Sequence, residues 1–198
     1  MSLKNPKNLI WLDLEMTGLD VEKEAIIEIA TIATDPELNI LEEGPCLVVH
    51  QNEDLLDKMD DWNKKHHGAS GLIEKVKKSK ISAKEAELQT IEFVKKYGVE
   101  NQTLLCGSTI GHDRKFLFKY MQKLHNYFHY RSIDVTSVKE LVLRWYSDGP
   151  KPPKKNEAHQ ALIDIRESID ELKFYRKHYF VSMFSNEIEH SPPKDPQG

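Results

Sequence analysis

The chain has 198 residues, of which 39% are hydrophobic and 30% are charged, and this composition is ordinary for one globular domain with a proper core. Its net charge of −4 argues against a protein that covers long nucleic acid, because such proteins usually carry a broad basic face. Any nucleic-acid substrate should therefore be small and bound locally.

Three strands are expected first. Apolar or β-branched segments at residues 9–16 and 26–34 predict the first two strands. Two shorter segments, 38–41 and 47–50, predict a third strand that is interrupted at Gly44 and Pro45. Because the connections between them are short, we expect an antiparallel meander.

Helical spacing then alternates with short extended segments. Helices are predicted over residues 54–65, 83–97, 113–124, 138–145 and 158–179, and further strands over 103–106 and 130–135. Ser82 and Glu85 form a capping box at the start of the second helix, and Gly98 can end it. The order of elements indicates an α/β fold with a mixed sheet and helices on its faces.

We expect a single domain over residues 1–180. Residues 181–198 are rich in proline and charge, and we expect them to form a disordered tail. No apolar run is long enough for a membrane span, and the first residues lack the apolar core of a signal peptide. With two cysteines, Cys46 and Cys106, a reducing cytoplasm is the simplest location.

Asp13 and Glu15 are the first candidates for chemistry. Alternation along a strand places both on one face, and the strand holds no lysine or arginine to neutralise them. A divalent cation such as Mg²⁺ or Mn²⁺ would resolve their repulsion, since it prefers oxygen ligands. Taken alone, the pair is better explained by a frayed strand end whose carboxylates lie in water, because Asp-x-Glu is a common pattern.

Two later positions are also ambiguous in isolation. Asp113 lies at the start of a predicted helix, where an acid is favourable whatever its function. His159 and Asp164 are five residues apart, about 140° around a helix, so they share a site only if His159 lies in a loose first turn. A surface histidine and a solvated aspartate would explain them equally well.

Their order along the chain changes this interpretation. Asp-x-Glu, then Asp before a helix, then His-x4-Asp resembles the DEDDh exonucleases of the ribonuclease H-like superfamily. WLDLEMTGLD, DDWNKKHHGASGLIEKV, CGSTIGHDRKFLFKYM, HYRSIDVTSVKEL and HQALIDIRESIDELKFYR resemble the oligoribonuclease family over nearly the whole chain, up to about Tyr179. Ile163 departs from the family pattern, which often has an acidic residue there.

The resemblance implies a five-stranded ribonuclease H-like sheet and 3′→5′ hydrolysis of short RNA, dinucleotides above all, to nucleoside 5′-monophosphates. It implies two divalent ions, Mg²⁺ or Mn²⁺, on Asp13, Glu15, Asp113 and Asp164, with His159 as general base. Leu19 and Trp62 would contact the terminal bases, and Thr109, Arg131 and Thr136 the 5′-phosphate. His67 and Tyr130 would reach that pocket from the partner subunit of a homodimer.

Three alternatives stay open on the residues. A DNA-directed or proofreading exonuclease of the same superfamily should show more basic surface. A nucleotide-binding module without catalysis would not need the intact acidic quartet. A zinc site on His125 and His129 lacks an evident third ligand.

Overall fold

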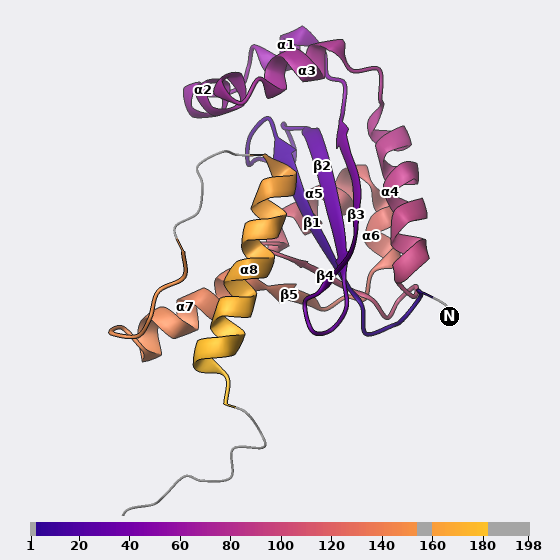
Figure 1. Ribbon diagram of the computed structural model, residues 1–198. Coiled ribbons are helices and arrows are strands. Elements are labelled where there is room, and N and C mark those ends of the chain that lie inside the picture. The colour runs from indigo at the N-terminus through magenta and orange to yellow at the C-terminus, as the bar shows by residue number, and fades with distance from the viewer. Residues whose placement is uncertain (1–2, 154–159, 182–198) are drawn as a thin grey trace, which may run out of the picture.

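A five-stranded mixed sheet forms the centre of the computed structural model, which describes residues 3–153 and 160–181 (Figure 1). Its strands are β1 (Leu9–Met16), β2 (Ile26–Thr34), β3 (Ile40–Val48), β4 (Leu104–Gly107) and β5 (Ser132–Asp134). They lie in the order β3-β2-β1-β4-β5. The first three pair antiparallel, whereas β4 is parallel to β1 and β5 to β4. The predicted mixed sheet and meander are confirmed.

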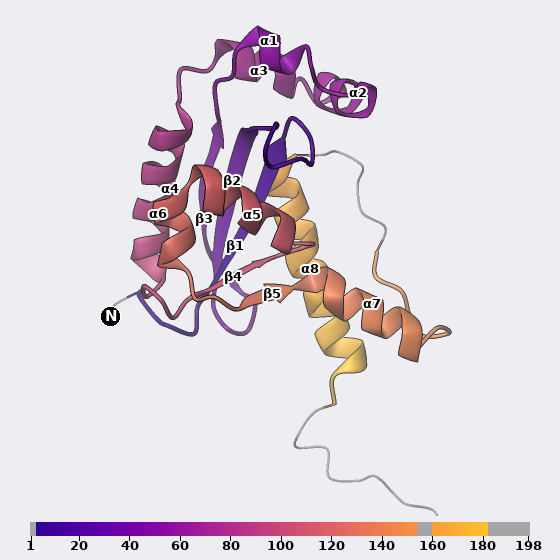
Figure 2. The ribbon, with the colours of Figure 1, turned by 180° about the vertical axis from the view of Figure 1, so that it is seen from behind.

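Helices cover both faces of this sheet. They are α1 (Glu53–Leu56), α2 (Asp61–Ala69), α3 (Leu72–Lys78), α4 (Ala83–Tyr97), α5 (Gly111–Tyr120), α6 (Gln122–Tyr127), α7 (Val135–Trp145) and α8 (Ala161–Tyr179). The long helix α8 packs on β1 and β2, whereas α4, α5 and α6 lie on the opposite face (Figures 1 and 2). The short helices α1 to α3 lie beyond one end of the strands.

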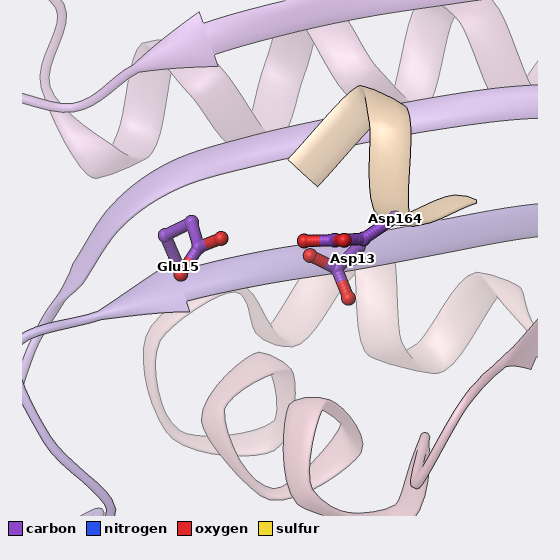
Figure 3. Close-up of side chains that lie close together, drawn as sticks. All are labelled: Asp13, Glu15 and Asp164. Carbon is purple, nitrogen blue, oxygen red and sulfur yellow. The ribbon is translucent and has the colours of Figure 1, made fainter. Parts of the chain in front are cut away.

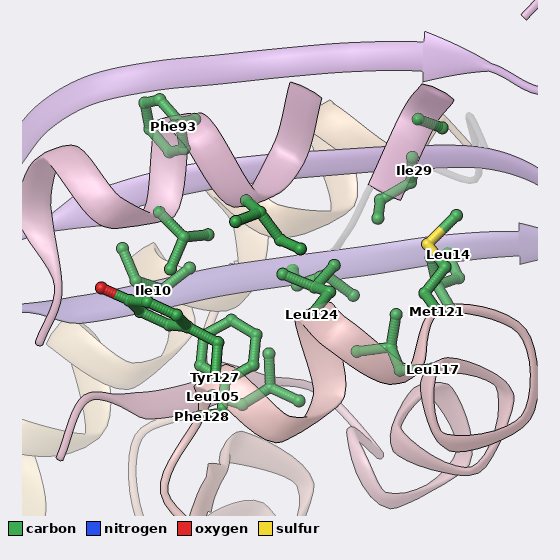
Figure 4. Close-up of a cluster of buried hydrophobic side chains, with 14 of the residues drawn as sticks. Ile10, Leu14, Ile29, Phe93, Leu105, Leu117, Met121, Leu124, Tyr127 and Phe128 are labelled. Carbon is green, nitrogen blue, oxygen red and sulfur yellow. The ribbon is translucent and has the colours of Figure 1, made fainter. Parts of the chain in front are cut away.

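Strand β1 separates two hydrophobic clusters. Ile10, Leu12 and Leu14 belong to the cluster on the side of α4, α5 and α6 (Figure 4). Trp11 belongs to the cluster that contains Ile165 and other buried residues of α8. Because side chains alternate along a strand, Asp13 and Glu15 share the face of Trp11 and point toward α8.

The interruption predicted in the third strand is wrong, because β3 runs through Gly44 and Pro45. β3 is an edge strand and pairs with β2 alone. Pro45, which lacks an N–H, therefore breaks no hydrogen bond to a second neighbouring strand. The register also shifts here, since Ala30 pairs with Cys46 but Ile32 pairs with Glu43. Two residues of β3 therefore face one residue of β2, and this bulge accommodates the Gly-Pro pair.

Two predicted helices are divided in the structure. The helix expected over 54–65 becomes α1 and α2, because the Asp60 side chain accepts a hydrogen bond from the Asn63 N–H and starts a new helix. The helix expected over 113–124 becomes α5 and α6, with a break at Met121, whose φ is −135°. Helix α3 was not predicted. By contrast, α4 has the predicted bounds and the predicted capping box.

Helix α8 begins at Ala161, later than the predicted residue 158. Residues 154–159, which include His159, lie outside the described residues, as does 182–198, most of the predicted tail. The predicted single domain and disordered tail therefore stay predictions. Among the described residues, no helix combines the length and the apolar character that crossing a bilayer requires.

Candidate active site

Two carboxylates of β1 lie on the sheet face that α8 covers. Asp13 is opposite Ala30 of β2, and Glu15 is opposite Glu28. Both side chains are half-buried, and on the same face further back along the strand Trp11 is fully buried and Leu9 is partly buried. The shared face is the one that strand alternation predicts. The alternative of a frayed strand end in water does not fit this burial.

Helix α8 contributes a third carboxylate to the same place. Asp164 lies in its first turn, and one oxygen from each of Asp13, Glu15 and Asp164 falls within a mutual distance of 4.8 Å (Figure 3). Among the described residues, no other group of three or more His, Cys, Asp or Glu side chains has ligand atoms so close together. The convergence of a β1 pair with an α8 residue makes this trio the candidate metal site.

Asp113 reaches the site from the opposite face of the sheet. It is in the first turn of α5, is 5% exposed, and its Oδ1 accepts a hydrogen bond from the Leu14 N–H at 3.0 Å. Leu14 lies between the two acids of β1. Asp113 is therefore more than a favourable charge at a helix start, because its side chain is bound to the strand that carries the site.

Burial and mutual repulsion raise the pKa values of these acids. Burial, followed by the charges of Asp113 and Glu15, raises the pKa of Asp13 well above its usual range. Burial and then the charge of Asp164 raise the pKa of Glu15 to about 8. Burial also raises the pKa of Asp113 to about 7, against the opposing effect of the Leu14 hydrogen bond. Several hard oxygen donors that repel one another fit a divalent cation, which would remove the repulsion.

These shifts predict that the metal-free protein loses stability as the pH rises from about 4.5 to about 8. Folding raises the pKa of Glu15 from 4.5 to about 8, so the folded protein binds this proton more tightly than the unfolded chain. The stabilisation by this proton is complete below pH 4.5, the pKa of Glu15 in the unfolded chain. It is lost as the pH rises through about 8, the pKa of Glu15 in the folded protein. Melting temperatures measured in EDTA across this range should therefore fall, and Glu15→Gln should flatten the fall. A wild-type melting temperature that rises over the range would contradict the prediction.

A pocket of about 170 Å³ opens next to Glu15, between the turn after β1 and helix α2. Leu19 and Trp62 line it and are 73% and 57% exposed, so core packing does not explain either side chain. The turn is held by hydrogen bonds, including one from the Thr17 N–H to the Ala25 carbonyl, and Leu19 projects from it. Two exposed apolar side chains beside a carboxylate cluster are suited to contact bases.

His67 packs against the end of β1 in its own chain. It is 2% exposed, and its Nε2 is 3.0 Å from the Met16 carbonyl oxygen of the same chain. Its Nδ1 is 3.9 Å from Glu15 Oε2. Helix α2 packs this side chain inward against the end of β1, and the expectation that His67 reaches the 5′-phosphate pocket of a partner subunit stays a prediction.

The residues expected around a 5′-phosphate gather near the end of β5. The hydroxyl oxygens of Thr109 and Thr136 are 3.1 Å apart. One oxygen of Asp134 accepts hydrogen bonds from the backbone N–H groups of both threonines, each at 2.9 Å. Thr109 has a positive φ of 55°, which is uncommon for a β-branched residue, and the Asp134 bond helps to hold it.

Arg131 and Tyr130 are both exposed and directly precede β5, whose last residue, Asp134, binds the two threonines. The guanidinium carbon of Arg131 is 5.3 Å from the centre of the Tyr130 ring. Within the described part of the chain, Arg131 makes no ion pair with a carboxylate. Its charge is therefore accessible to a ligand.

Sequence reasoning missed two acids near the site. Glu28 is 7% exposed on β2, and its charge contributes to the raised pKa values of Asp13 and Glu15. An acid inside the run IIEIATIAT was the available signal, because such runs are otherwise buried and apolar. Asp134 gave a weaker signal, since an acid before a helix is commonly only a cap.

Known proteins resemble this chain over nearly its whole length. Residues 10–172 match the exonuclease family. An oligoribonuclease of Actinobacillus pleuropneumoniae is 55% identical over 179 residues, which cover 90% of this chain and 97% of that protein. An oligoribonuclease of Shewanella loihica is 57% identical over 173 residues, which cover 87% and 96%.

This chain belongs to the oligoribonuclease family.

Membership makes the protein an exonuclease and hence a hydrolase, which confirms the family and the enzyme class indicated by the sequence. The relatives do not favour the DNA-directed alternative or the binding module without catalysis. The zinc alternative also finds no support among the described residues, because no cluster of metal ligands includes His125.

Solved structures confirm the ribonuclease H-like fold of the present chain. Exonuclease I of Methylocaldum szegediense matches with a TM-score of 0.65 at 19% identity, covering 86% of this chain and 40% of that one. E. coli exonuclease I in complex with a dA16 oligonucleotide matches with a TM-score of 0.67 at 14% identity, covering 87% and 41%. At these identities the likeness concerns the fold alone.

Proposed function

We propose that the protein is a metal-dependent 3′→5′ exoribonuclease that degrades short RNA, with a preference for dinucleotides. The observation that carries the proposal is the convergence of Asp13, Glu15 and Asp164 in a chain at least 51% identical to proteins named oligoribonuclease. The products would be nucleoside 5′-monophosphates. We place the reaction in the cytoplasm, in agreement with the cysteine usage of the sequence.

The residues fit a two-ion site. Asp13, Glu15, Asp113 and Asp164 would hold two divalent ions, Mg²⁺ or Mn²⁺, which supply Lewis acidity at the terminal phosphodiester. Asp113 keeps Leu14, and with it the backbone between the two β1 acids, in place. His159 would accept the proton of the attacking water, a role that suits a neutral imidazole near pH 7.

The two terminal bases would be held beside this site. Leu19 would insert between them, and the exposed Trp62 ring would stack on one of them, an interaction worth about 1–3 kcal/mol. Both side chains line the pocket next to Glu15. The scissile phosphate would then lie close to the carboxylates, so binding of the bases sets the position of cleavage.

The 5′ end of the substrate would meet Arg131, Thr109 and Thr136. Arginine suits a terminal phosphate, because its planar group can donate two hydrogen bonds to it. The two hydroxyls, already 3.1 Å apart, would donate further hydrogen bonds. A 5′-phosphorylated dinucleotide would fill the space between the carboxylates and this group. A longer RNA would present a bridging diester there, with less charge and with a further nucleotide to accommodate.

We therefore expect the wild type to cleave a 5′-phosphorylated dinucleotide faster than the unphosphorylated one, and Arg131→Ala to lose most of that preference. The measurement is kcat/KM for both substrates in both proteins. Arg144→Ala is a matched control, because this exposed arginine of α7 is already paired with Glu140. Equal cleavage of both substrates by the wild type, or a preference that Arg131→Ala leaves intact, would show that the 5′ pocket is built otherwise.

We also propose that the active species is a homodimer in which Tyr130 completes the 5′ pocket of the neighbouring subunit. Tyr130 is 73% exposed and follows an aromatic segment, as is common at interfaces. Light scattering at the assay concentration tests this proposal. A monomer with full activity would rule it out.

A further inference from the structure

Glu28 of β2 is a buried acid to which the mechanism above gives no role. It lies opposite Glu15 in the β1–β2 register and is surrounded along its own strand by buried residues. Burial of a carboxylate costs free energy unless hydrogen bonds compensate for lost water. The partner of Glu28 therefore indicates why an acid is present at this position.

Besides the Cys46 thiol of β3, the Glu28 carboxylate has a partner in the first residue of α8. Oε2 of Glu28 accepts a hydrogen bond from the Ala161 N–H at 3.3 Å. The preceding residue, Gln160, makes no side-chain hydrogen bond that would cap the helix. The first N–H groups of a helix need acceptors, and negative charge is favourable near that end. Glu28 thus supplies, from the sheet, a cap for α8 that the Gln160 side chain does not provide.

The capped end of α8 is also the end that carries a metal-site acid. Asp164 lies three residues after Ala161, and its N–H donates to the Gln160 carbonyl at 3.0 Å, within the same turn. Asp13 and Glu15, the acids that Asp164 meets, belong to the strand paired with β2. A shift of the helix start relative to β2 would therefore change the spacing of the trio. Ligand sites tolerate such shifts poorly, since they need positions fixed within about 0.5 Å.

We propose that Glu28 is a positioning residue, whose carboxylate holds the start of α8 against the sheet and so sets the place of Asp164 beside Asp13 and Glu15. The inference rests on the metal site of the proposed function. It assigns Glu28 no contact with metal or substrate.

An effect through charge alone is the competing explanation. The negative charge of Glu28 is among the causes of the raised pKa values of Asp13 and Glu15, so it also adds to the attraction for a cation. The two explanations differ for glutamine, which keeps an oxygen acceptor but has no charge. Positioning predicts that glutamine replaces Glu28 well and alanine replaces it badly, whereas a charge effect predicts similar losses for both.

The test is Mn²⁺ binding to the purified full chain, measured by calorimetry, with kcat and KM on a dinucleotide as the second readout. Glu28→Ala should weaken Mn²⁺ binding by about 10- to 100-fold, the usual effect of losing a residue that orients a ligand. Glu28→Gln should stay near the wild type. Glu37→Ala is the matched control, because it removes an ion pair with Arg176, which lies in the last turn of α8 and far from the helix start. It should leave Mn²⁺ binding unchanged.

A second variant removes the same hydrogen bond from the donor side. Ala161→Pro deletes the N–H at the first helical position, where proline is compatible with a helix. Gln160 has φ −128° and ψ 116°, a conformation that a residue before proline adopts readily. This variant should also bind Mn²⁺ more weakly, and it carries the test if Glu28→Ala does not fold.

The outcomes separate this inference from the proposed function. Wild-type Mn²⁺ affinity in folded Glu28→Ala, or equal losses in the alanine and glutamine variants, would overturn the positioning role while the metal site stands. A wild type that neither binds Mn²⁺ nor needs a divalent ion for hydrolysis would instead refute the metal site, and the inference with it.

Discussion

Asp164→Ala should abolish RNA hydrolysis and leave the protein folded. The aspartate is one of three acids whose oxygens lie within 4.8 Å of one another, and the proposed ions need all of them. Lewis-acid stabilisation of a reacting phosphate is worth several kcal/mol, so we expect a loss of about 10³-fold or more in kcat. Asp13→Ala should have the same effect.

The stability of these variants gives an independent check. In EDTA each substitution removes one of several half-buried acids that repel one another, so neither variant should melt below the wild type near pH 7. Asp170→Ala is the matched control on α8, because that exposed acid pairs with Lys173 and lies outside the site. It should retain full activity. Substantial turnover in folded Asp164→Ala would refute the proposed metal site.

His159→Ala should lower kcat by about 10²–10⁴-fold, the usual contribution of a positioned general base. His159 lies outside the described residues, so this expectation rests on the His-x4-Asp pattern and on the place of Asp164. The histidine accepts a proton and holds no ion in the proposed mechanism. Mn²⁺ affinity and KM should therefore change little, which distinguishes this variant from Asp164→Ala.

His178→Ala serves as the control for His159, because His178 is an exposed histidine in the last turn of α8. It should behave like the wild type. A His159 variant that keeps most of its activity would mean that this histidine is structural or dispensable, and that the proton goes elsewhere.

The strands and the best-capped helix were predictable because their signals are local. The alternation along β1 fixes the shared face of Asp13 and Glu15, and the capping box fixes the start of α4. Where the sequence prediction failed, the deciding contact is tertiary or the geometry is unusual. Pro45 is accommodated because β3 is at the edge of the sheet. The helix break at Met121 has no glycine or proline beside it that would predict it from the sequence.

The candidate site shows the same division. The residue order that resembles the oligoribonuclease family selects Asp113 and Asp164. Taken alone, Asp113 was better explained as a favourable charge at a helix start, and Asp164 as a solvated aspartate. Only the packing of α8 on β1 brings Asp164 to Asp13, and only α5 brings Asp113 to Leu14. The inward position of His67 and the contact of Glu28 with Ala161 also depend on elements distant in sequence.

Product analysis on RNAs of graded length tests most directly the proposal that this enzyme removes the shortest RNA fragments. The substrates would be 5′-labelled RNAs, from a dinucleotide upward in steps of one nucleotide, incubated with Mn²⁺ under single-turnover conditions. We expect nucleoside 5′-monophosphates released from the 3′ end and a rate that is highest for the dinucleotide and falls with length. A rate that is constant or rises with length, or cleavage from the 5′ end, would contradict the proposed function.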